Sequence, residues 1–178
     1  MNCQTRWPPV YDFVDLQKQI KTLIDDRVED DFYNNYPNND EFYQGDIIEL
    51  EAPFPFINED GDIAIYNTKK WLILGNTCDI TREDLNFTNI IPLDEIDSDI
   101  PRDILNDLRR FQSFKKTYFP DINKKHNGYV ADLTNICAIN KSFLNKNATK
   151  TSELTYPAWI LFHSCIVRYF ARDDGRHD

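Results

Sequence analysis

Glycine is scarce in this chain, and this scarcity excludes the loops that most often hold phosphate groups. Only five of the 178 residues are glycines. Phosphate-binding loops use glycine because their backbone must approach the ligand closely. The patterns G-x-x-x-x-G-K-[ST], G-x-G-x-x-G and G-x-S-x-G do not occur in the sequence. We therefore expect no cofactor, and no hydrolase built on a nucleophile elbow.

Paired cysteines and long apolar runs are also lacking. The four cysteines are Cys3, Cys78, Cys137 and Cys165, with no C-x-x-C and no zinc-ligand spacing. We expect thiols rather than disulfides, and no bound metal. No apolar run approaches the roughly 18–20 residues of a membrane span, and residues 1–9 do not resemble a secretory signal. The expected location is the cytoplasm, with no membrane contact.

Acidic side chains outnumber basic ones, and the formal net charge is -10. Such a field repels phosphate backbones, so it disfavours RNA as a partner. Lysines cluster at residues 115–116, 124–125 and 141–150, which we interpret as solvated faces. An alternative is that the acidic surface mimics nucleic acid and inhibits a DNA-binding protein.

The spacing of apolar residues predicts a single α+β domain in which helices pack on a small, strongly bent sheet or barrel. We expect an N-terminal helical extension and loop over residues 1–40, the domain over 41–172, and a tail over 173–178. Helices are expected over 12–28, 99–112 and 157–172. Strands are expected over 45–50, 63–66, 71–74, 87–93, 129–133 and 136–139. Residues 58–62 should close a hairpin, whereas 114–127 should be irregular.

Three segments resemble, in their order, the MazF/PemK family of SH3-like barrels. Residues 44–50 resemble the opening Gly-Asp-hydrophobic strand of that family. Residues 70–74 and 89–93 are similar to a strand pair whose second strand reads hydrophobic-Pro-hydrophobic. Residues 129–136, continuing toward Leu154, are similar to the closing strand and terminal helix. The resemblance covers about residues 43–170, and it implies an SH3-like barrel with the helix at 99–112 inserted.

The resemblance also implies a function, since the family contains metal-independent endoribonuclease toxins of toxin–antitoxin pairs. Their cleavage uses an arginine and a Thr or Ser, and the matching positions here are Lys70 and Leu93. Lysine lacks the bidentate guanidinium fork, and leucine has no hydroxyl. We therefore expect a non-catalytic or weakly catalytic binding or regulatory module of a prokaryotic or phage conflict system, toxin–antitoxin or defence, with a protein partner. The resemblance further implies a homodimer.

A polar loop at residues 75–80 is the strongest candidate site, because it directly follows a strand predicted to be buried. Three interpretations of this loop stay open. In the first, Asn76 or Asp79 closes an Asx-type turn and Cys78 packs inward. In the second, Asn76, Cys78, Asp79 and Arg82 bind a partner at one barrel edge, together with Lys70.

In the third interpretation the loop is catalytic. Cys78 would act as a nucleophile if His163 or His126 served as its base. An endoribonuclease with an altered site would instead use Lys70 with Asp79 or Thr77. The sequence gives no sign of a desolvated carboxylate pair.

Aromatic side chains supply the last candidate surface. Tyr118 and Phe119 follow two lysines in the segment that is expected to be irregular. Aromatic residues are enriched at protein interfaces, so we predict an exposed contact patch there.

Overall fold

The computed structural model describes residues 32–34, 41–51, 53–66 and 68–170. The predicted helix over residues 12–28 and the tail over 173–178 lie outside the described residues. Tyr33 forms a single antiparallel bridge with Leu154, and the Asn34 N–H donates to the Glu153 carbonyl at 2.8 Å. These contacts attach the first described residues to the segment that precedes the last helix.

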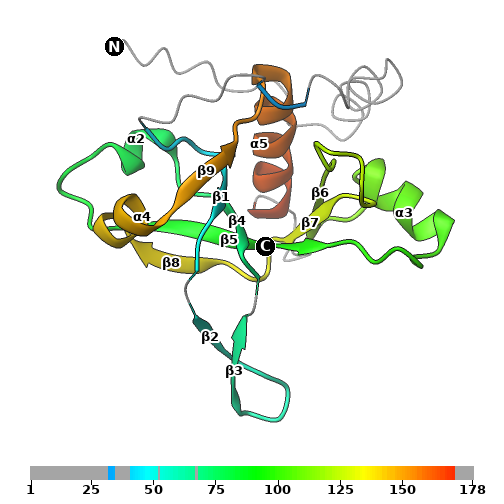
Figure 1. Ribbon diagram of the computed structural model, residues 1–178, viewed down its shortest axis with the longest axis horizontal. Helices are drawn as coiled ribbons and strands as arrows, with labels where there is room; N and C mark the ends of the chain where they lie inside the picture. Colours follow the sequence, from blue (N-terminus) through cyan, green and yellow to red (C-terminus); the bar gives the residue numbers. More distant parts are fainter. Residues whose placement is uncertain (1–31, 35–40, 52, 67, 171–178) are drawn as a thin grey trace, which may run out of the picture.

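Seven antiparallel strands of the described chain form one curled sheet, a half-barrel (Figure 1). Their order is β6–β7–β5–β4–β1–β9, and β8 pairs with β5 beside that path. β5 is nine residues long, and it joins the sheet together because its first half pairs with β8 and its second half with β7. The strands are β1 (Ile47–Glu49), β4 (Lys70–Ile73), β5 (Phe87–Glu95), β6 (Lys116–Phe119), β7 (Tyr129–Asp132), β8 (Cys137–Asn140) and β9 (Thr149–Ser152).

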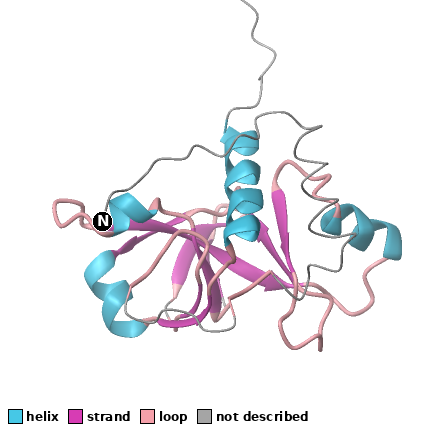
Figure 2. Ribbon diagram, turned by 90° about the horizontal axis from the view of Figure 1, so that it is seen from above, coloured by secondary structure: helices cyan, strands magenta, loops and turns pink. Residues whose placement is uncertain are grey.

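The described helices are α2 (Thr77–Ile80), α3 (Arg102–Arg109), α4 (Lys141–Asn147) and α5 (Tyr156–Phe170). The long helix α5 packs against the sheet, with the strands curving beneath it in Figure 2. α3 and α5 confirm the predicted helices within residues 99–112 and 157–172. The described domain is therefore α+β, with helices packed on a curled sheet.

Both faces of the central strands are buried. Trp71 and Ile73 belong to one apolar cluster with Leu144 of α4, and Leu72 belongs to a second cluster with Phe162 of α5. Successive side chains of a strand point to opposite faces, so one run of apolar residues serves two cores. This arrangement confirms the prediction of a strand that is buried on both faces.

β2 (Phe54–Ile57) and β3 (Ile63–Tyr66) form a separate hairpin that projects from the body (Figure 1). We call residues 53–66 the arm. Its turn is held by Asn58, whose side-chain oxygen accepts the N–H groups of Asp60 at 3.1 Å and Asp62 at 2.8 Å. The predicted hairpin turn at 58–62 is confirmed.

The expectation of irregular structure over residues 114–127 is wrong where the chain forms β6. Thr117 and Phe119 are buried, and β6 pairs with β7 along its whole length. The sequence also does not predict strand β9 or helix α4. The polar residues of β9 form a strand because β1 offers them an edge, which is a tertiary effect that local sequence does not record.

Candidate functional site

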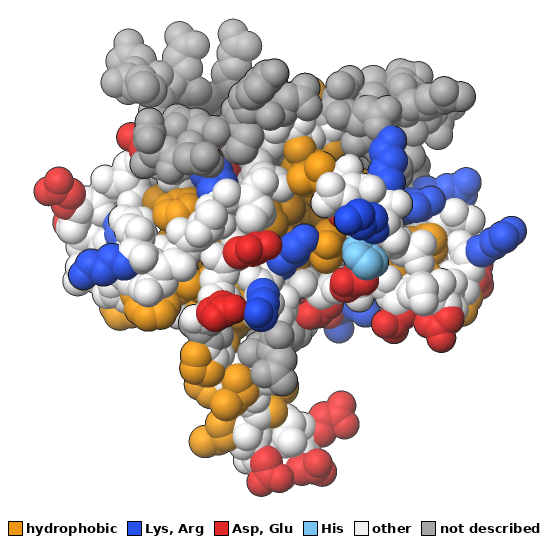
Figure 3. Space-filling model, viewed as in Figure 1, with side chains coloured by type: hydrophobic (Ala, Val, Ile, Leu, Met, Phe, Trp, Pro, Cys, Tyr) orange, Lys and Arg blue, Asp and Glu red, His pale blue; other side chains and the backbone are white. Residues whose placement is uncertain are grey.

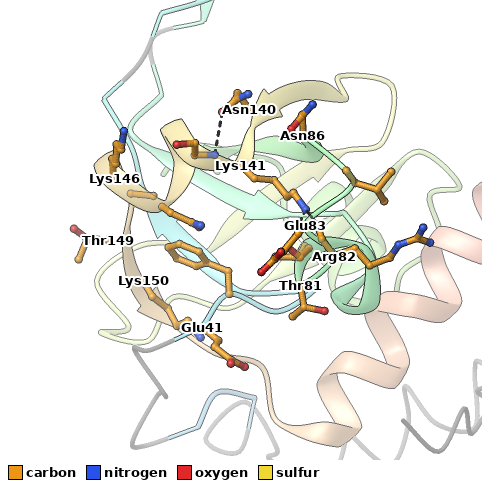
Figure 4. A pocket seen from close by; sticks show the side chains of 16 residues that line it. Glu41, Thr81, Arg82, Glu83, Asn86, Asn140, Lys141, Lys146, Thr149 and Lys150 are labelled. Carbon is orange, nitrogen blue, oxygen red and sulfur yellow. Dashed lines mark hydrogen bonds between the residues drawn. The ribbon is translucent and has the colours of Figure 1, made fainter. Parts of the chain in front are cut away.

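A pocket lies between α2, α4 and β9 (Figure 4). Its volume is about 910 Å³, near the upper end of the roughly 300–1,000 Å³ typical of ligand sites. Half of its polar side chains are amides and hydroxyls, which can both donate and accept hydrogen bonds, and the other half are charged. The wall consists of residues 41–42, 80–83, 85–86, 140–142, 145–146 and 148–150.

Lys141 connects two sides of this pocket. Its ammonium group donates to the carbonyls of Asp79 at 3.0 Å, Ile80 at 3.1 Å and Arg82. These carbonyls belong to the end of α2 and the residues just after it, where backbone acceptors have no partner within the helix. Figure 4 shows Lys141 extending from α4 toward the Arg82 and Glu83 segment. Lys141 therefore stabilises the pocket wall, and its charge is already engaged.

Arg82 and Lys146 are the cations that the pocket exposes to solvent. Arg82 forms an exposed ion pair with Asp84 at 2.7 Å, a contact that solvent screens strongly. Lys146 is exposed on α4 and forms no ion pair within the part of the chain that the structure describes. Two acidic residues, Glu41 and Glu83, also line the wall. The exposed charge at the pocket edge is thus mixed and modest in size.

Lys150 forms a buried ion pair at the back of the pocket. Its ammonium group lies 2.7 Å from the Asp46 carboxylate, and both side chains are 1% exposed. The carboxylate also accepts the Tyr43 N–H at 2.7 Å. Burial raises the pKa of Asp46 to about 6, although the Lys150 ammonium and the Tyr43 N–H act in the opposite direction. The pair joins the start of β1 to β9 and fixes the pocket wall.

The loop at residues 75–80 forms the short helix α2. Asn76 is its N-cap, and its side-chain oxygen accepts the Cys78 N–H at 3.0 Å, as the Asx-type turn predicts. The expectation that Cys78 packs inward is wrong, because Cys78 is exposed, as is Asp79. The Thr77 hydroxyl accepts the Gln44 N–H at 3.1 Å. Of the predicted binding residues only Arg82 lines the pocket.

His163, one of the two bases considered for Cys78, belongs to a structural network. Its Nδ1 lies 3.0 Å from the side-chain oxygen of Gln44, whose amide group donates to the Leu74 carbonyl at 2.8 Å. Burial lowers the pKa of His163, and its ring packs against Trp159. This network joins α5 to the segment before β1. The Nδ1 of His126, the other candidate, lies 2.8 Å from the carboxylate of Glu95, the last residue of β5.

Lys70 lies apart from the α2 residues. It is the first residue of β4, whereas α2 follows the other end of that strand, roughly 10 Å of strand away. Its ammonium group donates to the Tyr129 hydroxyl at 2.8 Å. The structure therefore does not bring Lys70 together with Thr77 or Asp79. Leu93, which matches the family's hydroxyl position, is buried.

The predicted aromatic patch is wrong. Tyr118 and Phe119 are 4% and 0% exposed, because β6 places both rings in the main apolar cluster. Two lysines before them suggested solvent exposure, but exposure ends at Lys116, the first residue of β6, and the next three residues of the strand are all buried.

Lys141, Lys146 and Lys150 line the pocket, so the interpretation of this lysine cluster as a solvated face is wrong for these three residues. One local signal was available in Asn140, whose side chain accepts the Ser142 and Phe143 N–H groups and begins α4. A helix that begins directly after β8 places Lys141 and Lys146 on the same helix, α4. The buried position of Lys150 depends on Asp46, about one hundred residues earlier, and no local pattern contains it.

No family model, curated protein or solved structure matches this chain. No described helix is long and apolar enough to cross a membrane. Among the described residues, no group of three or more His, Cys, Asp or Glu side chains could hold a metal ion. The pocket between α2, α4 and β9 is the site on which a functional proposal can rest.

Proposed function

We propose that this chain is a binding module without cleavage activity, and that its pocket takes an extended, acidic segment of a partner protein. The proposal rests on the position of the pocket beside β9. This strand is the last in the described sheet, and its residues Thr149 and Lys150 line the pocket. An edge strand presents backbone N–H and C=O groups that pair with an added strand.

A polypeptide suits this pocket better than a nucleic acid. Single-stranded nucleic acid is usually held by a continuous basic groove with several aromatic stacking platforms. Here Phe42 is the one aromatic residue of the described wall, and Glu41 and Glu83 oppose the cations. A net charge of -10 further weakens the attraction of a phosphate backbone. Asparagine, serine and threonine side chains match the hydrogen-bonding groups of a peptide.

We also propose a family relation for the half-barrel and a biological system in which it acts. We take the half-barrel to be a divergent SH3-like barrel of the MazF/PemK kind, acting in the cytoplasm in a prokaryotic or phage conflict system. The order of the three resembling segments supports this relation. Tyr129 engages Lys70, and Leu93 lies in the core. Both observations favour a relative that binds rather than cleaves.

A labelled peptide of alternating glutamate and valine tests the pocket by fluorescence anisotropy. Binding should weaken about tenfold, or ~1.4 kcal/mol, in Arg82→Glu/Lys146→Glu, because the exposed cations are reversed. The control Lys115→Glu/Lys116→Glu reverses two exposed charges beside and on β6, and it should bind as wild type does. Equal losses in both variants, or no loss in either, would contradict the proposal.

The ribonuclease alternative has its own readout. The wild-type chain and its Lys70→Ala variant are incubated with a long mixed-sequence RNA in EDTA. We expect the RNA to stay intact with both. Discrete cleavage by the wild type alone would make this chain a metal-independent endoribonuclease and refute the binding-module proposal.

A further inference from the structure

The arm exposes more apolar surface than a hairpin can keep in water without cost. Ile57, Ile63 and Ile65 are 67%, 74% and 53% exposed. In the hairpin register, Ile57 faces Ile63 and Pro55 faces Ile65, so these side chains share one face of the two-stranded ribbon. Figure 3 shows this apolar surface along the projecting shaft of the arm. A two-stranded hairpin is only marginally stable by itself, so its exposed face indicates a contact surface.

The tip of the arm has a charge of one sign. Glu59, Asp60 and Asp62 lie within four residues, and residues 53–66 contain no lysine or arginine. The arm therefore carries three negative charges and no positive one. The bonds from Asp60 and Asp62 to Asn58 fix the turn in advance, so little conformational entropy is lost when the turn is bound.

We propose that the arm of one copy enters the pocket of a second copy, and that reciprocal exchange of arms forms a dimer. The inference rests on the proposed function, since the arm is an extended, acidic segment of the kind that the pocket would take. The acidic turn would contact Arg82 and Lys146, the exposed cations of a wall that also contains Glu41 and Glu83. Ile57 and Ile63, which flank the turn, match the apolar part of the wall that includes Ile80.

The occupant comes from another copy because the arm points away from its own pocket. The arm projects from the body on a different side from α2 and α4, which form the pocket (Figure 1). A contact between two different surfaces produces an open chain unless the symmetry closes it. Two arms exchanged about one twofold axis make two identical contacts and leave no unfilled arm or pocket. The expected assembly is therefore a closed dimer.

Sedimentation velocity of two complementary charge-reversal variants tests the exchange. One variant reverses the arm, Glu59→Lys/Asp60→Lys/Asp62→Lys, and the other reverses the pocket, Arg82→Glu/Lys146→Glu. The wild type should sediment as a dimer that dissociates as salt is added, since the contact charges are near solvent. Each variant alone should be monomeric, because like charges meet at both contacts. An equimolar mixture should form a heterodimer, because basic arm meets acidic pocket and acidic arm meets basic pocket.

Recovery in the mixture also shows that both variants are folded. As a matched control, Asp99→Lys/Asp103→Lys/Asp107→Lys reverses three exposed charges on or beside α3, and it should remain a dimer. A monomeric wild type at every concentration, reversed variants that stay dimeric, or a mixture that stays monomeric would each overturn the inference. If the wild type is monomeric yet the glutamate–valine peptide still binds the pocket, the exchange fails and the proposed function stands. If the dimer follows the predicted pattern but the peptide fails to bind the arm-reversed monomer, whose pocket is empty, the pocket takes the arm of a second copy and not an acidic segment of another protein.

Discussion

At the scale of single residues, the Asp46–Lys150 ion pair is the most consequential feature of the pocket. Both side chains are almost completely buried, so each has lost the hydration that a surface charge keeps. Removing one member of such a pair leaves an uncompensated buried charge and typically destabilises a protein by about 3–5 kcal/mol. Replacing both members by neutral groups of similar size is much less harmful. The pair therefore fixes geometry more than it adds stability.

Asp46 also gives the folding stability a defined pH dependence. Burial raises its pKa in the folded chain to about 6, from 3.8. Between these values the folded chain binds more protons than the unfolded one, so the free energy of unfolding falls as pH rises. Between these two pKa values the free energy of unfolding should fall by about 1.4 kcal/mol per pH unit, and by no more than about 3 kcal/mol in total. Above pH 6 it should level off. Urea unfolding at a series of pH values from 4 to 7 measures it.

The double variant Asp46→Asn/Lys150→Met is the control for this prediction. It lacks the titrating carboxyl, so the decline assigned to Asp46 should disappear. His163 acts in the opposite direction, because burial lowers its pKa and the folded state gains stability as pH rises toward 6.5. Since both proteins retain His163, its effect cancels in the comparison. The same pH profile in wild type and double variant would show that the carboxyl is not the source.

At the scale of elements, Gly128 permits the turn that begins β7. Its φ is +104°, and a Cβ added there would lie 2.6 Å from the Phe119 carbonyl oxygen, which is part of the backbone. Gly61 in the arm has a φ of +84°, but nothing lies within 4 Å of an added Cβ. We predict that Gly61→Ala costs about 1 kcal/mol and Gly128→Ala about 3 kcal/mol. Chemical denaturation measures both, and equal losses would show that crowding by β6 is unimportant.

Elements built on apolar runs could be predicted from sequence, whereas elements built on pairing could not. The run at residues 71–74 predicts β4, and the apolar spacing at 157–172 predicts α5. By contrast, β9 contains no strongly apolar residue and is a strand because β1 lies beside it. The apolar residues of β6 are Tyr118 and Phe119, and their burial depends on contacts with β7 and α5. The difference is between local pattern and long-range contact.

Some residues of the candidate site could also be predicted from local sequence, whereas others could not. Arg82 was predicted as a binding residue from a polar loop after a buried strand, and it does line the pocket. The Asn76 cap also followed from local sequence. Lys146 and Lys150 could not be assigned, since a run of lysines looks the same on a solvated face and on a pocket wall. Folding brings them together with residues about sixty to one hundred positions earlier.

At the scale of the whole molecule, the net charge does not describe the local charges of the pocket wall and of the arm. The net charge of -10 describes the average surface, whereas the pocket wall has four basic and two acidic side chains. The arm has three acidic side chains and none that is basic. Local charge, rather than the sum, determines which segments meet at short range. Two of the four basic groups, Lys141 and Lys150, are already engaged within the protein, so Arg82 and Lys146 are the cations left for an acidic segment.

Hydrogen exchange with mass spectrometry tests most directly whether this pocket binds an acidic polypeptide. The arm-reversed variant, whose arm cannot enter the pocket, is labelled with and without a saturating amount of the glutamate–valine peptide. We expect slower exchange in residues 80–86 and 141–152, because the peptide covers the wall and pairs with β9. Residues 116–132, which contain β6 and β7 at the opposite edge of the sheet from β9, should exchange at the same rate in both samples. Protection confined to residues 116–132, or spread evenly over the chain, would contradict the assignment of the pocket as the binding site.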